Sequence, residues 1–221
     1  MLRSALTLAV QLLPAVLLML LGWGLDDLPA FFANPARVAF AALLVAAALA
    51  AVLLRLDLNP LRQGATPAGT QTVQLAPLLA LSLALLWFLP YADRRTILTL
   101  RHESWRYIGV LCCVLGAAVR LLALKSLGPN FSAYVTLQPN HRLVQRGIYA
   151  RIRHPLYLSL LLVPTGIALV FASKLAWPIL ALAGIFVHDR MRSEERLLAS
   201  HFAAEFENYK RRTWKLIPLL F

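Results

Sequence analysis

Long, nearly unbroken apolar blocks are the feature that most constrains how this chain can fold. Hydrophobic residues make up 60% of the 221 residues and charged residues only 14%, and no water-soluble domain of this size needs such blocks. A helix crosses the hydrocarbon of a bilayer with about 20 predominantly apolar residues. The sequence therefore predicts an all-α fold, a polytopic membrane helix bundle.

About six segments come close to the length of a transmembrane helix. They are residues 4–25, 36–54, 73–91, 106–124, 156–173 and 174–190. Only Ser173 and Lys174 separate the last two, which predicts a tight helical hairpin interrupted by Pro164 and Pro178. The first segment follows Arg3, but it is longer than the apolar core of a secretory signal and lacks a small-x-small cleavage site, so we expect a span there.

The basic residues orient this bundle. The net charge is +12, and with six crossings and a cytoplasmic C-terminus most Lys and Arg side chains fall on the cytoplasmic side, as the positive-inside rule requires. We therefore expect a multi-pass protein of the bacterial inner membrane that attracts anionic lipid headgroups. No nucleic-acid partner is expected, because the charges are spread over loops between spans.

Several familiar kinds of site are missing from the sequence. The adjacent Cys112 and Cys113 cannot bridge usefully, and without a nearby His or carboxylate they make a poor metal site, so no metal is expected. The chain has no Gly-x-Gly-x-x-Gly after a strand, no phosphate loop, no His-Glu-x-x-His and no Gly-x-Ser-x-Gly. A nucleotide-like cofactor would thus not be held in a soluble Rossmann domain.

Polar sequence gathers in residues 125–155 and 190–218, and the predicted hairpin makes both emerge on one face of the membrane. The connector from Gly128 to Arg153 is too long for a simple turn, and long ordered loops are usually functional. The tail predicts a separate amphipathic helix from about Ser193 to Arg212, since apolar residues recur there at helical spacing. Residues 1–100 hold mostly Ala, Leu and Val with scattered boundary charges, and no chemistry is expected there.

One ordered combination of motifs is specific. The run Arg153-His154-Pro155-Leu156-Tyr157 is followed, after the apolar hairpin, by Glu194-Glu195-Arg196-Leu197-Leu198 and then by Phe202, Glu205-Phe206, Tyr209, Arg212 and Ile217-Pro218. In this combination the last 95 or so residues resemble the isoprenylcysteine carboxyl methyltransferase family and its phospholipid N-methyltransferase relatives. The chain departs from the family's usual pattern at Ser159 and at Thr213-Trp214, which affects the detailed shape of the pocket.

The resemblance implies a membrane methyltransferase that binds S-adenosylmethionine on the cytoplasmic side, in a pocket made by the connector and the tail. Residues 1–126 would form transmembrane helices one to four, and residues 127–221 the catalytic region. By this resemblance the catalytic residues are Arg190 and Glu194. The cofactor-binding residues are Val144, Gly147, Tyr149, Arg153, His154, Pro155, Tyr157, Glu194 and Glu195.

The chemistry of these side chains suits such a cofactor. Arg153, His154 and the two Tyr residues can serve a carboxylate, while Glu194 and Glu195 can accept from an ammonium and a ribose. Each residue also has a structural reading: the cations as snorkelling boundary residues, the Tyr residues as anchors at the membrane interface, and the Glu residues as solvated helix positions. Arg190 and Glu194 are four residues apart, which also fits a surface ion pair.

The methyl acceptor stays open among lipophilic carboxylates, thiols and amines. A carboxylate needs no base and Arg190 would orient it, whereas Glu194 or His154 would take the proton of a thiol or amine. Small residues such as Gly116 and Gly166 predict a lateral gap for the acceptor, and Arg120 either snorkels or touches it. The alternative functions are an NADPH-dependent membrane reductase of related fold and a non-catalytic membrane protein.

Overall fold

The computed structural model describes residues 15–54, 69–128 and 143–218, with only the backbone given for residues 69–81. The described part is helical and contains no strand, only two isolated bridges, Thr99 with Ser173 and Ile152 with Trp214. The elements are the helix Ala15–Trp23, η1 (Leu25–Asp27), α2 (Leu28–Ala33), α3 (Pro35–Leu53), α4 (Gly69–Arg94), α5 (Ser104–Leu127), η3 (Gly147–Ala150), α6 (Pro155–Val170) and α7 (Ala176–Arg212). The predicted all-α class is confirmed for these residues.

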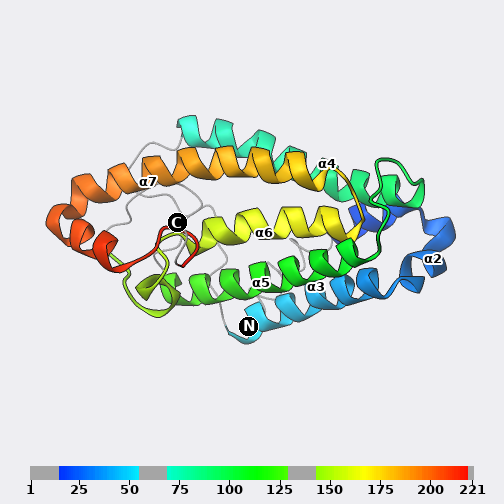
Figure 1. The fold of residues 1–221 in the computed structure, drawn as a ribbon, viewed down its shortest axis with the longest axis horizontal. Helices are drawn as coiled ribbons and strands as arrows, with labels where there is room; N and C mark the ends of the chain where they lie inside the picture. The colour runs from blue at the N-terminus through cyan, green and yellow to red at the C-terminus, as the bar shows by residue number, and fades with distance from the viewer. Residues whose placement is uncertain (1–14, 55–68, 129–142, 219–221) are drawn as a thin grey trace.

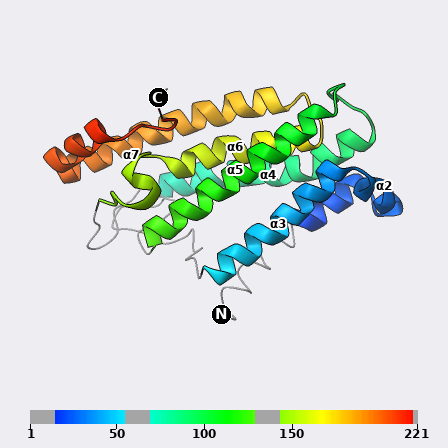
Figure 2. The ribbon, with the colours of Figure 1, turned by 60° about the horizontal axis from the view of Figure 1, so that its bottom comes forward.

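The long helices run side by side along the long axis of the molecule (Figure 1). In both ribbon views α6 lies between α5 and α7, and α3 packs on the other side of α5 (Figure 2). The start of α6, the end of α5 and the end of α7 share one end of the bundle, at the left of Figure 1. The opposite end holds α2, the start of α3 and the end of α4.

Within the described residues, two helices, α3 and α5, are long and apolar enough to cross a membrane, and the pair Ala15–Trp23 and Leu25–Ala33, bent by 77°, would be a third if it forms one span. The segments predicted at 36–54 and 106–124 correspond to these two helices. The segment predicted at 73–91 lies within α4, and α6, at 16 residues, is shorter than a typical span. The connector turns predicted at residues 129–130 and 138–140 lie outside the described residues.

Local sequence explains where several helices begin. The side chain of Asn34 accepts hydrogen bonds from the backbone N–H groups of Ala36 and Arg37, and Pro35 takes the first position of α3. Pro155 likewise opens α6 directly after His154. This confirms the predicted helix start and places His154 at a helix terminus.

The tail predicted to be helical, from about Ser193 to Arg212, is helical, but no separate helix begins at Ser193. α7 runs from Ala176 to Arg212 as two helical parts joined at Ala203, so the segment expected to start near Ser193 begins within the first part. No Gly or Pro stands between residues 185 and 212 to end it. The one break is a kink at Ala203, whose backbone has φ 43°, and beyond it Phe206 and Tyr209 are buried.

The lateral gap predicted at Gly116 and Gly166 is also contradicted, because these glycines lie in the tight crossing of α5 and α6. A Cβ at Gly116 would come within 2.7 Å of Val163 Cγ2, and one at Gly166 within 2.7 Å of Cys113 Sγ. At Gly109 a Cβ would meet backbone atoms of α6 at 2.5 Å and 2.6 Å. The small residues therefore permit close helix packing.

A buried ion cluster at the end of the bundle away from His154 joins Arg37 and Arg106 to Asp93. The Asp93 carboxylate, with a side chain 2% exposed, is 2.8 Å from Arg37 Nη1 and 2.7 Å from Arg106 Nη2. Arg37 also donates to Phe31 O and stacks on the Trp23 ring. The cluster joins α3, α4 and α5, since residues far apart in sequence supply its charges.

Candidate functional site

The candidate site forms where the chain returns to the start of α6. The backbone N–H groups of Arg153 and His154 donate to Trp214 O (2.8 Å) and Lys215 O (3.1 Å), and Trp214 N–H donates to Arg151 O. These bonds hold the segment after α7 against the segment before α6. The two polar regions of the sequence thus meet at one end of the bundle, as predicted.

Glu195 is the most heavily paired carboxylate of the site. Its carboxylate oxygens lie 3.0 Å from His154 Nε2, 3.5 Å from Arg153 Nε and 3.4 Å from Lys215 Nζ. Burial raises the pKa of Glu195, but the His154 hydrogen bond and the charges of His154, Lys215 and Arg153 outweigh it and lower the pKa to about 2. Glu195 is therefore ionised. It links α7 to the start of α6 and to Lys215 in the segment after α7.

Arg153 is directed at the end of α7. Its Nη1 donates to Lys210 O at 2.9 Å and to Thr213 O, and it lies 3.3 Å from Thr213 Oγ1. Carbonyl groups at a helix C-terminus have no partner within the helix, so a guanidinium there caps them. In the described structure Arg153 and Glu195 bind protein groups. We therefore call them supporting residues, because their contacts hold the segments of the site together.

A second group of side chains lies beside these supporting residues. Glu194 Oε2 is 3.9 Å from His154 Nδ1, and the Glu194 side chain is 36% exposed. Arg190 Nε donates to Tyr157 Oη at 3.4 Å, and the rings of His154 and Tyr157 are 5.6 Å apart. Cation, carboxylate, imidazole and phenol are thus gathered where α6 begins and α7 passes it.

Tyr149 closes one side of the site from η3. Its ring is buried, and its backbone carbonyl accepts a 2.7 Å hydrogen bond from Tyr209 Oη. Burial raises the pKa of both Tyr149 and Tyr209, so both phenols are neutral at physiological pH. The sequence analysis named Tyr209 as part of the tail motif without a partner, and the structure shows that its hydroxyl ties the end of α7 to η3.

The other expected cofactor-binding residues lie at the margin of this group. Gly147 has φ 62°, and a Cβ there would come within 2.3 Å of Ser126 Oγ at the end of α5, so glycine is required for the close approach. Pro155 is buried. Val144 is half-buried before η3, and no side-chain contact places it in the group.

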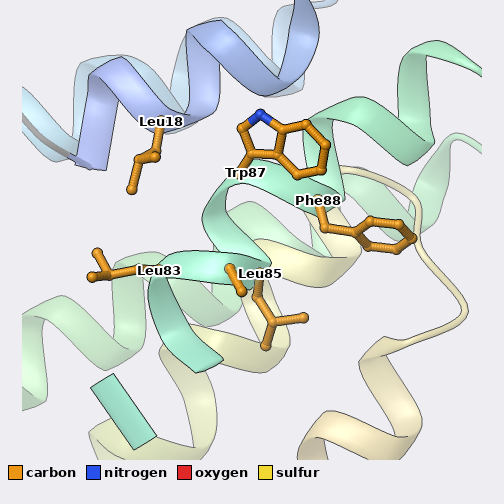
Figure 3. Close-up of a pocket in the computed structure, with 6 residues that line it drawn as sticks. Leu18, Leu83, Leu85, Trp87 and Phe88 are labelled. Carbon is orange, nitrogen blue, oxygen red and sulfur yellow. The ribbon is translucent and has the colours of Figure 1, made fainter. Parts of the chain in front are cut away.

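A separate cavity of about 600 Å³ lies between the helix Ala15–Trp23 and α4 (Figure 3). Leu18 points across it toward Leu83 and Trp87, and its other lining residues are Ala84, Leu85 and Phe88. This lining offers no group for acid, base or ionic chemistry. Among the described residues, no three His, Cys, Asp or Glu side chains are placed to hold a metal ion.

Comparison with known proteins agrees with the motifs. Residues 109–200 match the isoprenylcysteine carboxyl methyltransferase family, so the resemblance predicted from the sequence is confirmed over these residues. The protein-S-isoprenylcysteine O-methyltransferase of Tribolium castaneum is 31% identical over 116 residues, which are 51% of this chain and 41% of that protein. The enzyme of the same name from Saccharomyces cerevisiae is 33% identical over 116 residues, 51% of this chain and 48% of that protein.

The fold comparison extends over nearly the whole chain. A solved structure of the eukaryotic intramembrane Ras methyltransferase, isoprenylcysteine carboxyl methyltransferase, superposes with a TM-score of 0.57 at 22% identity and covers 93% of this chain and 74% of that one. The chain therefore shares the fold of that membrane protein, and with its apolar helices it is an integral membrane protein. It spans about half the length of the curated relatives it matches.

Proposed function

We propose that this protein transfers a methyl group from S-adenosylmethionine to a lipophilic acceptor at the membrane surface. The observation that carries the proposal is the grouping of His154, Tyr157, Arg190 and Glu194 within the stretch that matches the methyltransferase family. The named relatives are O-methyltransferases of isoprenylcysteine. A lipophilic thioether that carries a carboxylate is therefore the acceptor we propose for this chain.

The donor groups present fit the cofactor. S-adenosylmethionine has a carboxylate, an ammonium and a positively charged sulfur, so it needs a cation or N–H donors, a carboxylate and aromatic walls. Glu194 is partly exposed and lies near His154 and Tyr157, which suits it to accept from the ammonium beside these rings. His154 and Tyr157 supply ring faces, and when bound the cofactor would supply an electrophilic methyl group on sulfur.

The residues of the chain would chiefly align the reactants and exclude water. Arg190 would hold the acceptor carboxylate one helical turn from Glu194, and no base is needed for a carboxylate acceptor. Arg153 and Glu195 would act as positioning residues, because their contacts fix the tail and His154. Val144, Gly147, Tyr149 and Pro155 would complete the wall of the cofactor site.

The membrane arrangement is part of this proposal. Six spans with a cytoplasmic C-terminus would place the site on the cytoplasmic face, with residues 1–126 as the membrane scaffold and residues 127–221 as the catalytic region. The excess of Lys and Arg at the end of the bundle that holds the site supports this orientation. The membrane we propose as its location is a bacterial inner membrane.

Ligand binding to the detergent-solubilised protein tests the proposal. We expect S-adenosylhomocysteine, but not NADPH, to raise the midpoint of thermal unfolding. Glu194→Ala and His154→Ala should abolish binding of S-adenosylmethionine in calorimetry without unfolding the bundle. Glu194→Gln, which removes one charge-assisted hydrogen bond worth about 1.5 to 3 kcal/mol, should weaken binding roughly 10- to 100-fold.

Glu207→Gln is the matched control, because Glu207 is an exposed residue of the same helix that pairs only with Lys210. It should bind the cofactor as the wild type does. Normal affinity in the Glu194 and His154 variants would reject the site. Stabilisation by NADPH alone would indicate a reductase instead, and no binding of either ligand would indicate a non-enzyme.

A further inference from the structure

The short segment that follows α7 has one face toward the protein and one face toward its surroundings. Lys215 pairs with Glu195, and Leu216 is buried. The side chains of Trp214 and Ile217, in contrast, are 42% and 43% exposed. Two large apolar side chains thus lie uncovered on a segment whose neighbouring side chains are directed inward.

This segment lies at the level where α6 begins. Trp214 forms a bridge with Ile152, three residues before Pro155 opens α6, and Figure 1 shows the segment, in red, returning beside that helix start. The proposed arrangement puts the cytoplasmic boundary of the membrane at the same level. Trp is typical of such a boundary, because its ring is apolar and its N–H is polar.

Exposed cations accompany these apolar side chains. Trp214 N–H donates to the carbonyl of Arg151 at 2.8 Å, and Arg212 lies two residues before Trp214. Both Arg side chains are exposed, and within the described part of the chain no ion pair includes either of them. The preceding carboxylate of α7, Glu207, pairs with Lys210 instead. We call the exposed group the tail patch: Arg151, Arg212, Trp214 and Ile217.

The tail patch is joined directly to the candidate site. The backbone N–H groups of Arg153 and His154 donate to the carbonyls of Trp214 and Lys215, and Lys215 also pairs with Glu195. A short segment held by so few contacts has a low local stability, so a further contact on its outer face favours the docked position. Because the same bonds hold His154, docking of the segment and binding of the cofactor favour each other.

We propose that the tail patch binds the anionic phospholipid surface of the membrane in which the protein lies, and that this contact raises the affinity of the site for its cofactor. Trp214 and Ile217 enter the interfacial layer, and Arg151 and Arg212 pair with the phosphates of anionic lipids. The inference rests on the proposed function and adds regulation of that site by lipid charge. The patch includes Trp214, where the chain departs from the family's usual pattern.

The test compares S-adenosylhomocysteine binding in nanodiscs of phosphatidylcholine alone and of phosphatidylcholine with phosphatidylglycerol. We expect the wild type to bind about 3- to 30-fold more tightly in the anionic discs, the range for two cations near a charged surface. Arg151→Gln with Arg212→Gln should lose this gain and keep the affinity seen in neutral discs. Arg151→Lys with Arg212→Lys should retain the gain, because the charges are kept.

A second measurement follows the lipid contact without any cofactor. A polarity-sensitive dye is attached to Pro218→Cys, an exposed position beside the patch, in a background with Cys112→Ser and Cys113→Ala. Its emission should shift to shorter wavelength in anionic discs, and brominated lipid should quench it. Trp214→Ala should reduce both the quenching and the gain in cofactor affinity.

Arg101→Gln with Lys174→Gln is the matched control, because it removes two exposed cations from the opposite end of the bundle, and it should behave as the wild type. Equal wild-type affinity in the two kinds of disc would overturn the proposal. So would a gain that survives Arg151→Gln with Arg212→Gln, or one that the control also loses. A Trp214→Ala variant that loses affinity in both kinds of disc while the dye still inserts would assign Trp214 to the cofactor instead.

The two measurements also separate this inference from the proposed function. Insertion of the dye in anionic discs without any binding of S-adenosylhomocysteine would reject the proposed cofactor and leave the lipid contact of the tail patch standing. Binding of S-adenosylhomocysteine that is equal in both kinds of disc, with no insertion of the dye, would leave the proposed function standing and remove the tail patch from it.

Discussion

The side chain of Glu195 connects α7 to the start of α6 and to the segment after α7. Three cationic or hydrogen-bonding partners reach it from the start of α6 and from the tail, and none of them is within 19 residues of it in the sequence. A carboxylate with this many partners is stabilised in its charged form, which lowers its pKa. The consequence is a dependence of folding stability on pH.

Glu195→Gln should lower the free energy of unfolding at neutral pH. It should also remove the part of the loss of stability at acidic pH that comes from protonation of Glu195. The folded-state pKa of about 2 lies below the ordinary 4.5, so the carboxylate stabilises the fold above pH 4.5 and loses this effect as pH falls to 2. At roughly 1.4 kcal/mol per pKa unit, the effect is on the order of 3 kcal/mol. Thermal unfolding in detergent from pH 7 to pH 2 measures it.

The wild-type and Glu195→Gln curves should converge between pH 4.5 and pH 2. Glu207→Gln, at an exposed pair of the same helix, should follow the wild type throughout. Curves for wild type and Glu195→Gln that stay parallel over this range would show that Glu195 is not the group that titrates.

At the scale of the helices, α5 and α6 pack closely against each other. Their crossing is made by glycines whose missing side chains let the two backbones approach, with Gly109 against the end of α6 and Gly116 against its middle. In a membrane this kind of contact, and not burial from water, drives helix association. The glycine positions therefore control the separation of the helices.

Gly109→Ala should destabilise the bundle strongly. The new Cβ would lie 2.5 Å from Val170 N and 2.6 Å from Gly166 O, and backbone atoms cannot move aside without moving the helix. We expect a loss of about 1 to 3 kcal/mol, the usual cost of overpacking, seen as a lower midpoint of thermal unfolding in detergent.

Gly184→Ala on α7 is the matched control, because nothing lies within 4 Å of a Cβ there. It should be neutral or stabilising by about 0.5 to 1 kcal/mol, since alanine is the better helix former. Equal effects of the two substitutions would mean that the glycine crossing does not limit the approach of the helices.

The molecule as a whole has two polar ends of different character. The end with His154 and Glu194 is partly exposed, whereas the other end is closed by Asp93 between Arg37 and Arg106. Asp93 is 2% exposed and the two Arg side chains are 9% exposed, so each charge depends on its partners. A buried ion group of this kind is strongly destabilised when one partner is removed.

Asp93→Asn should remove the buried counter-charge that Arg37 and Arg106 share, leaving Arg106 its exposed partner Glu103, and cost about 3 to 5 kcal/mol. Chemical or thermal unfolding in detergent measures the loss. Asp26→Asn at the exposed pair with Arg94 is the control and should change stability little. A small effect of Asp93→Asn would show that the cluster is hydrated or that another group replaces the carboxylate.

The two ends should also lie on opposite sides of the membrane. We expect an impermeant thiol reagent to label His102→Cys in intact cells and to leave Arg211→Cys unlabelled, in a background with Cys112→Ser and Cys113→Ala. Both positions are exposed, and permeabilised cells should label both. Labelling of Arg211→Cys alone in intact cells would invert the proposed orientation.

The sequence by itself determined the all-helical membrane class of the protein and the approximate positions of α3 and α5. Hydropathy of a long run, a Pro after His154 and an Asn before Pro35 act over a few residues, so they can be read locally. The short hairpin predicted between the last two apolar segments was enough to predict that the polar segments before α6 and after α7 come together.

The tertiary structure decided which charges pair and how closely the helices pack. Arg153 and Glu195 pair with other protein groups, and Arg37 and Arg106 are buried around Asp93. Gly116 lies in the tight crossing of α5 and α6, one turn from the exposed Arg120. Each of these outcomes depends on contacts between helices that lie tens of residues apart. No periodicity within one segment specifies such contacts, since they follow from the distance and register at which neighbouring helices pack.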